Sequence, residues 1–281
     1  MHLQQILRRH RTILFALTLC VAVPAAQAQL VAIEENTGVL YGVSTTDAAL
    51  DLIGPTGLTD LGALEFNPYD GVLYGLTTGA DAALYGFVIA PTLDDVTAYL
   101  IGELGIYIYE GGLAFAPDGT AYGVNGGVTT SVLFTLDLDT GEATAINTLS
   151  GRHDIAGLGW RDDGLLVGLD STTGTLLTID PVTAQIGHIE DMDPLIGSIG
   201  GMVLTGGDTG YFSTAGLHAL TPGSNELYSF NPYSGDHTQI GLFDDTVITG
   251  AGFAALSVIP EPTTLGLLIL GSIGLLRRRA T

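Results

Sequence analysis

The chain has 281 residues, of which 40 are glycine and none is lysine, and its formal net charge is −22. The segment 29–258 is more acidic than the whole, with 29 Asp and Glu residues against two arginines and a formal charge of −27. A field of this sign repels nucleic acid and attracts cations or basic partners, so we expect no nucleic-acid partner. The one cysteine, Cys20, lies near the N-terminus, which excludes disulfides and thiolate zinc sites elsewhere.

Residues 1–28 have the three parts of a secretory signal peptide. A basic region with three arginines precedes an apolar stretch, and the small residues Ala26 and Ala28 stand just before Gln29. The apolar stretch is short for a membrane span. We therefore expect signal peptidase to cut before Gln29 and the rest of the chain to be exported.

The segment 29–258 repeats one pattern about five times, and residues 112–141 show it best. An apolar run ending at Phe115 is followed by a Pro-Asp-Gly turn and a second run around Tyr122. A third run, 132–136, alternates with the period of a strand and leads into an Asp-Leu-Asp-Thr-Gly turn. A fourth run follows, so each copy predicts four short strands.

The other copies keep the same order of runs and turns. We assign the second strand of successive copies to the runs around Tyr41, Tyr74, Tyr122, Val167 and Tyr211, which are 33, 48, 45 and 44 residues apart. First strands carry the aromatic residues Phe66, Phe115 and Trp160. Third strands carry Leu52, Leu136, Ile179 and Phe230, each before a turn.

A period of about 40–45 residues with four strands is typical of a β-propeller blade. We therefore predict an all-β fold, a β-propeller of about five four-stranded blades formed by 29–258 as one domain. The last run, 252–256, resembles a first strand and is expected to pair with the first copy and close the ring. A β-sandwich and a β-solenoid are the alternatives; a sandwich also has short strands, but it does not require the same turn at the same place in every copy.

Three acidic residues precede first strands at nearly the same distance. Asp60, Glu110 and Asp154 stand five or six positions before the first-strand aromatics, which would bring three carboxylates to one rim of the channel. Oxygen ligands of this kind suit calcium. The alternative is that they are ordinary turn acids in an acidic chain. Calcium is the one cofactor considered, and otherwise we expect none.

Little in the sequence favours catalysis. Asp154 follows His153, and such a pair can act as an oriented base, but no Ser or Cys nucleophile is tied to it. The first strands consist mainly of Gly, Ala, Leu and Phe, with Glu65 and Arg161 as the few polar residues nearby. We therefore expect no enzyme.

The tail, residues 259–281, combines three features in a fixed order. The triplet Pro260, Glu261, Pro262 is followed by an apolar run, 265–276, and then by Arg277, Arg278 and Arg279. The run is short for a full span, so it predicts a short transmembrane helix acting as a marginal anchor. The arginines are expected on the cytoplasmic side, with the preceding domain outside.

This tail resembles the PEP-CTERM sorting signal of exported bacterial proteins, with Ile259 where Val is commoner. The resemblance implies recognition by an exosortase, a membrane protease-transferase, and removal of the tail near the triplet. The same kind of tail is also labelled an ice-binding protein C-terminal domain, but 29–258 lacks the threonine ladder that an ice-binding face needs.

These features together favour an exported, non-enzymatic protein. We expect an exosortase-type system to sort it to the cell surface or extracellular matrix, where it binds polysaccharide, cations or surface proteins, or serves as structural material. The alternative is a calcium-dependent propeller hydrolase or lyase with Asp60, Glu110 and Asp154 as ligands.

Overall fold

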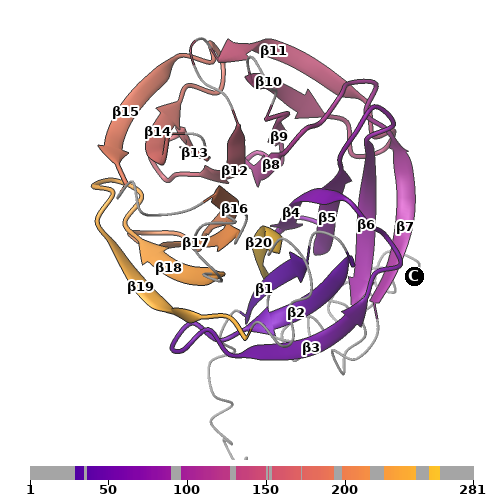
Figure 1. The fold of residues 1–281 in the computed structure, drawn as a ribbon. Helices are drawn as coiled ribbons and strands as arrows, with labels where there is room; N and C mark the ends of the chain where they lie inside the picture. Colours follow the sequence, from indigo (N-terminus) through magenta and orange to yellow (C-terminus); the bar gives the residue numbers. More distant parts are fainter. Residues whose placement is uncertain are drawn as a thin grey trace, which may run out of the picture.

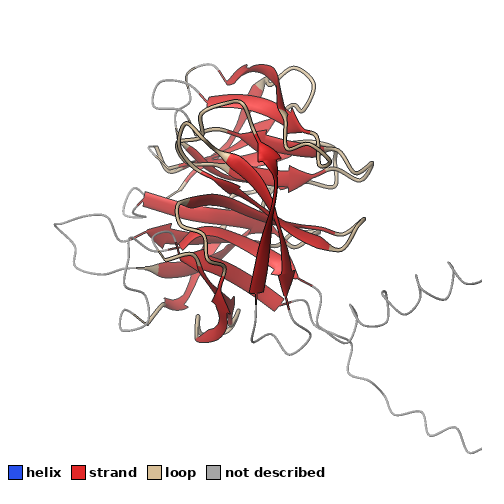
Figure 2. Cartoon of the chain, turned by 90° about the vertical axis from the view of Figure 1, so that its right-hand side faces the viewer, coloured by secondary structure: helices blue, strands red, loops and turns tan. Residues whose placement is uncertain are grey.

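A computed structural model describes residues 29–34, 37–89, 96–126, 131–149, 151, 154–171, 173–192, 198–215, 225–244 and 253–259. Within these ranges the chain forms twenty strands in five four-stranded sheets, arranged as a ring of blades (Figure 1). Figure 2 shows the same residues as strands and loops without a helix. The predicted five-bladed β-propeller is thus confirmed.

Each sheet is one blade with consecutive strands, except at the point of closure. From the centre outward, blade 1 consists of β20 (Phe253–Ile259), β1 (Gln29–Glu34), β2 (Val39–Val43) and β3 (Leu50–Pro55), and blade 2 consists of β4 (Leu61–Asn67), β5 (Val72–Thr77), β6 (Ala83–Ile89) and β7 (Val96–Glu103). Blade 3 consists of β8 (Gly112–Phe115), β9 (Ala121–Val124), β10 (Ser131–Leu136) and β11 (Ala143–Leu149), and blade 4 consists of β12 (Ile155–Trp160), β13 (Leu166–Asp170), β14 (Thr175–Ile179) and β15 (Ile186–Asp191). Blade 5 consists of β16 (Ser198–Leu204), β17 (Gly210–Ala215), β18 (Glu226–Phe230) and β19 (His237–Leu242).

The ring closes through its last strand. β20 lies antiparallel to β1, with Gln29 opposite Ile259 and Ala32 opposite Leu256. The predicted pairing of the last apolar run with the first copy is therefore confirmed. β20 ends at Ile259, one residue past the predicted domain boundary at 258.

The pairing of β20 with β1 also corrects the strand positions predicted for the first copy of the repeat. Because β20 occupies the central position of blade 1, β1 is the second strand and β2, with Tyr41, is the third. Leu52, predicted on a third strand, lies on the outermost strand β3. The other strand positions hold, since Tyr74, Tyr122, Val167 and Tyr211 lie on second strands and Leu136, Ile179 and Phe230 on third strands. An alternating apolar run identifies a strand, but its distance from the axis depends on pairing across the whole chain.

The predicted signal peptide and the predicted tail helix lie outside the described residues. Among the residues that are described, no helix is long and apolar enough to cross a membrane.

The core lies between blades rather than within one. Five clusters of buried apolar side chains each join two neighbouring blades. Phe134, for example, is fully buried between blades 2 and 3, and its ring lies where a side chain at Gly123 would stand, 2.3 Å from that position. Burying such a side chain stabilises the fold by about 1.5–3 kcal/mol. A blade therefore depends on its neighbours for most of its burial.

A polar contact adds to the interface between blades 4 and 5. Arg161, just after β12, is only 9% exposed and donates two hydrogen bonds to the carboxylate of Asp163, at 2.8 and 2.6 Å. Its Nη1 donates to the carbonyl of Pro232 in the β18–β19 turn at 3.0 Å. The guanidinium carbon lies 4.6 Å from the ring centroid of Tyr233. Arg161 thus connects the inner turn of one blade to the outer turn of the next.

We predict that Arg161→Ala lowers the free energy of unfolding by about 1–3 kcal/mol. The hydrogen bond to Pro232 and the contact with Tyr233 are lost from a buried site, whereas the half-exposed ion pair with Asp163 contributes little. Urea unfolding measures the change. Asp162→Ala, at the exposed neighbouring position, serves as the control, and equal stability of the two variants would contradict the prediction.

Candidate functional site

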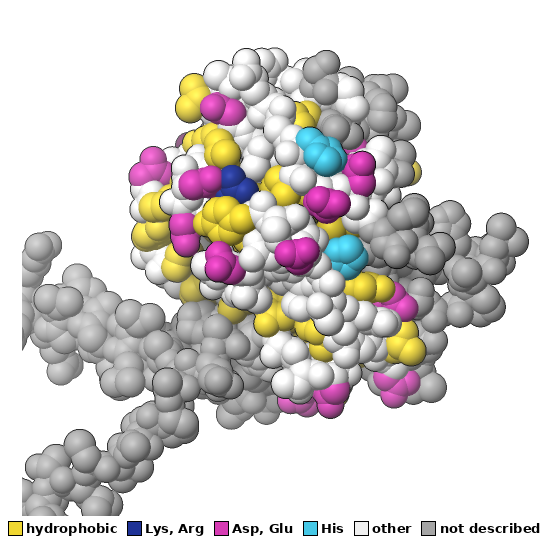
Figure 3. Space-filling view, turned by 90° about the vertical axis from the view of Figure 1, so that its left-hand side faces the viewer, with side chains coloured by type: hydrophobic (Ala, Val, Ile, Leu, Met, Phe, Trp, Pro, Cys, Tyr) yellow, Lys and Arg dark blue, Asp and Glu magenta, His cyan; other side chains and the backbone are white. Residues whose placement is uncertain are grey.

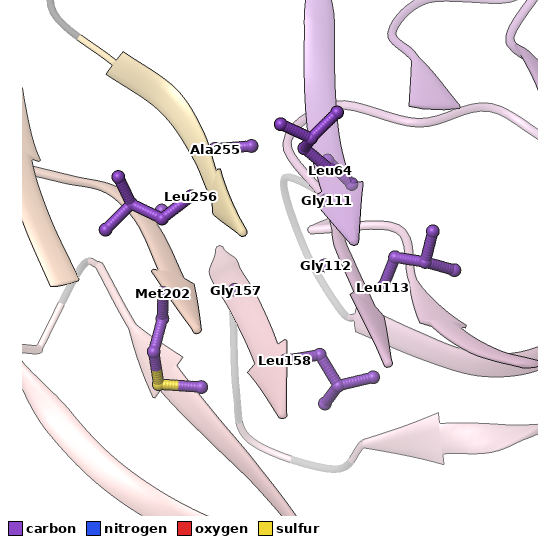
Figure 4. Close-up of a pocket in the computed structure, with 11 residues that line it drawn as sticks. Leu64, Gly111, Gly112, Leu113, Gly157, Leu158, Met202, Ala255 and Leu256 are labelled. Atoms are coloured by element: carbon purple, nitrogen blue, oxygen red, sulfur yellow. The ribbon is translucent and has the colours of Figure 1, made fainter. Parts of the chain in front are cut away.

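The axis of the propeller is closed by the close approach of the innermost strands. These five strands run in the same direction around it, and Figure 4 shows the side chains of Leu113, Leu158 and Leu256 pointing away from the space between them, toward the core between blades. That space has a volume of about 10 Å³, which holds about one water molecule. Its larger lining residues are Leu64, Leu113, Leu158, Met202 and Leu256. Among the described residues, none that lines this cavity has a titratable side chain.

Glycines allow the innermost strands to approach so closely. A side chain at Gly112 would stand 2.6 Å from the backbone nitrogen of Leu158, and one at Gly157 would stand 2.6 Å from Met202. Gly157 also has a φ of 131°, which other residues rarely adopt. Packing at the axis therefore requires small residues at these positions.

The innermost strands all begin at one end of the axis, and we call this end the upstream mouth. Asp60 and Asp154 lie there, directly before β4 and β12, and Glu110 lies two residues before β8. All three residues therefore lie just before innermost strands, at the same end of the axis. Asp60 and Asp154 have φ values of 59° and 52°, the left-handed conformation that Asp tolerates better than most residues.

The same hydrogen bond fixes this turn in two blades. The carbonyl of Asp60 accepts from the backbone N–H of Thr78 at 2.7 Å, and that of Asp154 accepts from Ser171 at 2.9 Å. Thr78 and Ser171 each follow the second strand of their blade. A structural requirement of the turn thus accounts for an Asp at these positions.

The carboxylates do not form a preformed metal site in the described part of the chain. Within it, no three His, Cys, Asp or Glu side chains are grouped closely enough to hold a metal ion. Asp60 is exposed and accepts from the hydroxyl of Thr59 at 2.9 Å, whereas Oε2 of Glu110 and Oδ1 of Asp154 are fully buried. Calcium binding at these three residues therefore stays a prediction.

Sequence reasoning missed an aromatic feature at the same mouth. Tyr107 and Tyr109, in the connection between β7 and β8, are 53% and 46% exposed, and we call this pair the tyrosine ledge. Residues 106–109 read Ile-Tyr-Ile-Tyr, which alternates like a strand although it lies in a connection. This alternation is the sequence pattern that could have predicted two tyrosines on the exposed side.

At the opposite, downstream mouth the innermost strands end, and Glu65 of β4 lies near it. Its backbone is paired with that of Tyr74, and its Oε2 is fully buried with no hydrogen-bond partner among the described residues. Burial raises the pKa of the Glu65 carboxyl well above its ordinary value.

The remaining predicted site residues lie mainly at the chain ends. Ala26, Ala28, Pro260–Pro262 and Arg277–Arg279 are outside the described residues, as is His153. Gln29 is described and begins β1. The residues next to both predicted processing points, Gln29 and Ile259, are therefore direct neighbours in one ladder.

The fold and this arrangement define a five-bladed β-propeller with a closed axis and an acidic exterior. Figure 3 shows acidic side chains, in magenta, spread over the side that carries β15 and β19. Residues 26–217 match the family described as a repeat of unknown function, DUF6923. The chain belongs to this family.

Solved structures confirm the propeller fold and no more. A chain from a nidogen–laminin complex is 10% identical with a TM-score of 0.55, over 84% of this chain and 99% of that one. A protein of unknown function from Bacteroides thetaiotaomicron is 13% identical with a TM-score of 0.51, over 76% of this chain and 58% of that one. The PQQ-bound aldose sugar dehydrogenase from Streptomyces coelicolor is 10% identical with a TM-score of 0.51, over 72% and 90%. No curated protein matches the sequence.

Enzymes and proteins of unknown function thus share this fold, and identities of 10–13% transfer no activity. Whether this chain is an enzyme depends on its own site.

We predict that Glu65→Gln makes the protein more stable at pH 8 than the parent chain, and that the advantage shrinks toward pH 5. The folded state holds the proton of Glu65 more tightly than the unfolded chain does, because its pKa is raised. In the parent chain, the contribution of Glu65 to the free energy of unfolding is therefore fully present below the unfolded pKa of about 4.3. It falls as the pH rises toward the folded pKa. The amide never ionises, so the variant escapes this loss.

Urea midpoints at pH 5 and pH 8 measure the difference. Glu103→Gln, at an exposed position of β7, controls for the loss of one negative charge. A constant difference between Glu65→Gln and the parent across this range would contradict burial as the controlling effect.

Proposed function

We propose that this is an exported, non-enzymatic binding or structural protein that an exosortase-type system sorts to the cell surface or extracellular matrix. The observation that carries the proposal is the pairing of Gln29 with Ile259. Signal peptidase cutting before Gln29 and an exosortase acting near Pro260–Pro262 would both act at the same end of one strand ladder, just outside its terminal pair. Both cuts leave every blade whole, and this fits a domain built to survive both processing steps.

The closed axis favours binding over catalysis. The apolar lining of Leu64, Leu158 and Met202 offers no acid, base or metal ligand where the innermost strands meet. Binding at a mouth needs only a rigid rim with exposed side chains, which the blade connections supply.

The position of the end of β20 also predicts how the propeller is oriented relative to the membrane. Ile259 lies at the downstream mouth, and five residues separate it from the apolar run that begins at Leu265. Five extended residues span at most about 18 Å. A chain held by this tail therefore keeps its downstream mouth near the membrane and turns its upstream mouth away from it.

Replacing Pro260, Glu261 and Pro262 together by Ala should keep the tail on the protein in a host that has an exosortase. The parent chain should appear at the surface or in the medium with its tail removed, and the variant should stay in the membrane fraction at its longer mass. Cell fractionation with intact mass spectrometry reads both results.

Thr263→Ala with Thr264→Ala alters the same linker without touching the triplet and serves as the control. Removal of the tail from the Pro-Glu-Pro variant would contradict sorting through this motif.

The second candidate is a calcium-dependent propeller hydrolase or lyase at the upstream mouth. The placement of Asp60, Glu110 and Asp154 around that mouth favours it. Asp60 and Asp154 also lie in turns with the same backbone conformation and the same hydrogen bond. Calcium would then bring the three carboxylates together on binding, because no three such groups are preformed among the described residues.

If this candidate is correct, calcium should raise the melting temperature of the parent chain, and the variant Asp60→Asn, Glu110→Gln, Asp154→Asn should lose that rise. Calcium at 100 times its Kd stabilises the folded state by about 2.7 kcal/mol. Asp208→Asn, an exposed acid in the β16–β17 turn, is the matched control. A melting temperature that does not respond to calcium rules the candidate out.

A further inference from the structure

The tyrosine ledge stands on a short extended segment with alternating sides. Ile108 forms an isolated bridge with Gly79, with backbone N–O distances of 2.7 and 3.2 Å, and its side chain is fully buried. Ile106 packs partly against the same core cluster. Tyr107 and Tyr109 therefore face the other side, away from the core, and their Cα atoms are about 7 Å apart at the rise of an extended strand.

Hydrogen bonds hold the ledge in place before any ligand arrives. The N–H of Tyr109 donates to the carbonyl of Asn125 at 2.9 Å, and Nδ2 of Asn125 donates to the carbonyl of Tyr107 at 3.3 Å. Oδ1 of Asn125 accepts from the N–H of Val132 at 2.8 Å. These bonds anchor the ledge to blade 3 and the bridge to Gly79 anchors it to blade 2, so binding a ligand costs little ordering entropy.

One exposed acidic residue lies close to the ledge. The backbone carbonyl of the exposed Asp60 accepts from the N–H of Thr78, which directly precedes the Gly79 that bridges Ile108, whereas Glu110, directly after Tyr109, is half-buried. Carboxylates accept hydrogen bonds and do not donate them when ionised. The complementary ligand is therefore rich in donors, and the field of a chain with charge −22 excludes an anionic one.

We propose that the tyrosine ledge binds a neutral polysaccharide. A sugar ring has an apolar C–H face that packs on the electron-rich face of a tyrosine, and its edge carries hydroxyls that donate to carboxylates. Two rings on one side of an extended segment suit successive units of one chain. This inference rests on the proposed binding function and assigns a site and a ligand class to it.

The position of the ledge agrees with the orientation argued above. It lies at the upstream mouth, at the opposite end of the innermost strands from Ile259. As long as the tail is attached, the ledge therefore faces away from the membrane.

Affinity electrophoresis of the purified full-length chain in detergent tests the proposal. The probes are dextran, hydroxyethyl cellulose and a linear β-1,3-glucan as neutral polysaccharides, alginate as an anionic one, and polylysine as a cationic polymer. At least one neutral glucan should retard the protein equally at 50 and 500 mM NaCl, and alginate should not. Tyr107→Ala and Tyr109→Ala should each weaken retardation about 2- to 12-fold, the range for one lost aromatic contact.

Tyr107→Phe and Tyr109→Phe keep the stacking faces and should retain most of the binding. Tyr69→Ala, which removes a tyrosine that is 56% exposed at the downstream mouth, should leave binding unchanged. Unchanged melting temperatures separate loss of binding from loss of folding.

Three outcomes overturn the proposal: no retardation by any neutral glucan, equal losses in Tyr69→Ala and the ledge variants, or retardation by polylysine alone that disappears at 500 mM NaCl. The last outcome assigns the ledge to a basic partner. A chain that is sorted and processed as proposed but binds no glucan refutes the ledge inference and leaves sorting intact.

Discussion

The ladder between β20 and β1 is the constraint on which the ring depends. Every other sheet is built from strands that follow one another in the chain, so each can form locally. Blade 1 alone joins residues that are more than 200 positions apart. Until this ladder forms, the innermost strand of blade 1 is missing, and both β4 and β16 lack the neighbour against which they pack. Loop closure on this scale is slow and costly in entropy, and the burial between blades offsets it.

The same constraint explains why small and apolar residues line the axis. Five strands meet around one point only if their backbones approach closely, and Gly112, Gly157 and Gly201 make this possible. A polar group among them would lose its water without gaining a partner. Glu65 illustrates the effect, because it stands at the edge of this region and burial already shifts its proton affinity. The mouths, where the connections differ between blades, are free of this packing constraint.

Local sequence was enough to predict the blades but not their radial order. Turns such as Pro117-Asp118-Gly119 and alternation such as Val132–Leu136 are local properties, and they located strands correctly. Tyr41 was placed one strand too far inward, because the run around it resembles the second strand of other copies and only ring closure reveals the difference.

The candidate site was partly accessible from sequence as well. Counting back from first-strand aromatics placed Asp60, Glu110 and Asp154 at one mouth correctly. Whether their carboxylates come together depends on backbone direction and on the width of the ring, which spacing does not encode. The tyrosine ledge was missed because Tyr107 and Tyr109 lie in a connection, and their exposure depends on Ile108 pairing with Gly79 some 30 residues earlier.

The termination of β20 at Ile259 has a mechanical consequence. In a chain held by its C-terminal end, drag from flow or from the matrix becomes tension that enters the fold through this innermost strand. Hydrogen bonds in an antiparallel ladder lie perpendicular to the strands, so a pull along β20 loads the six pairs with β1 in shear, all at once. Shear of a whole ladder resists force better than peeling pair by pair. The strand that closes the ring is thus also the one suited to carry the load.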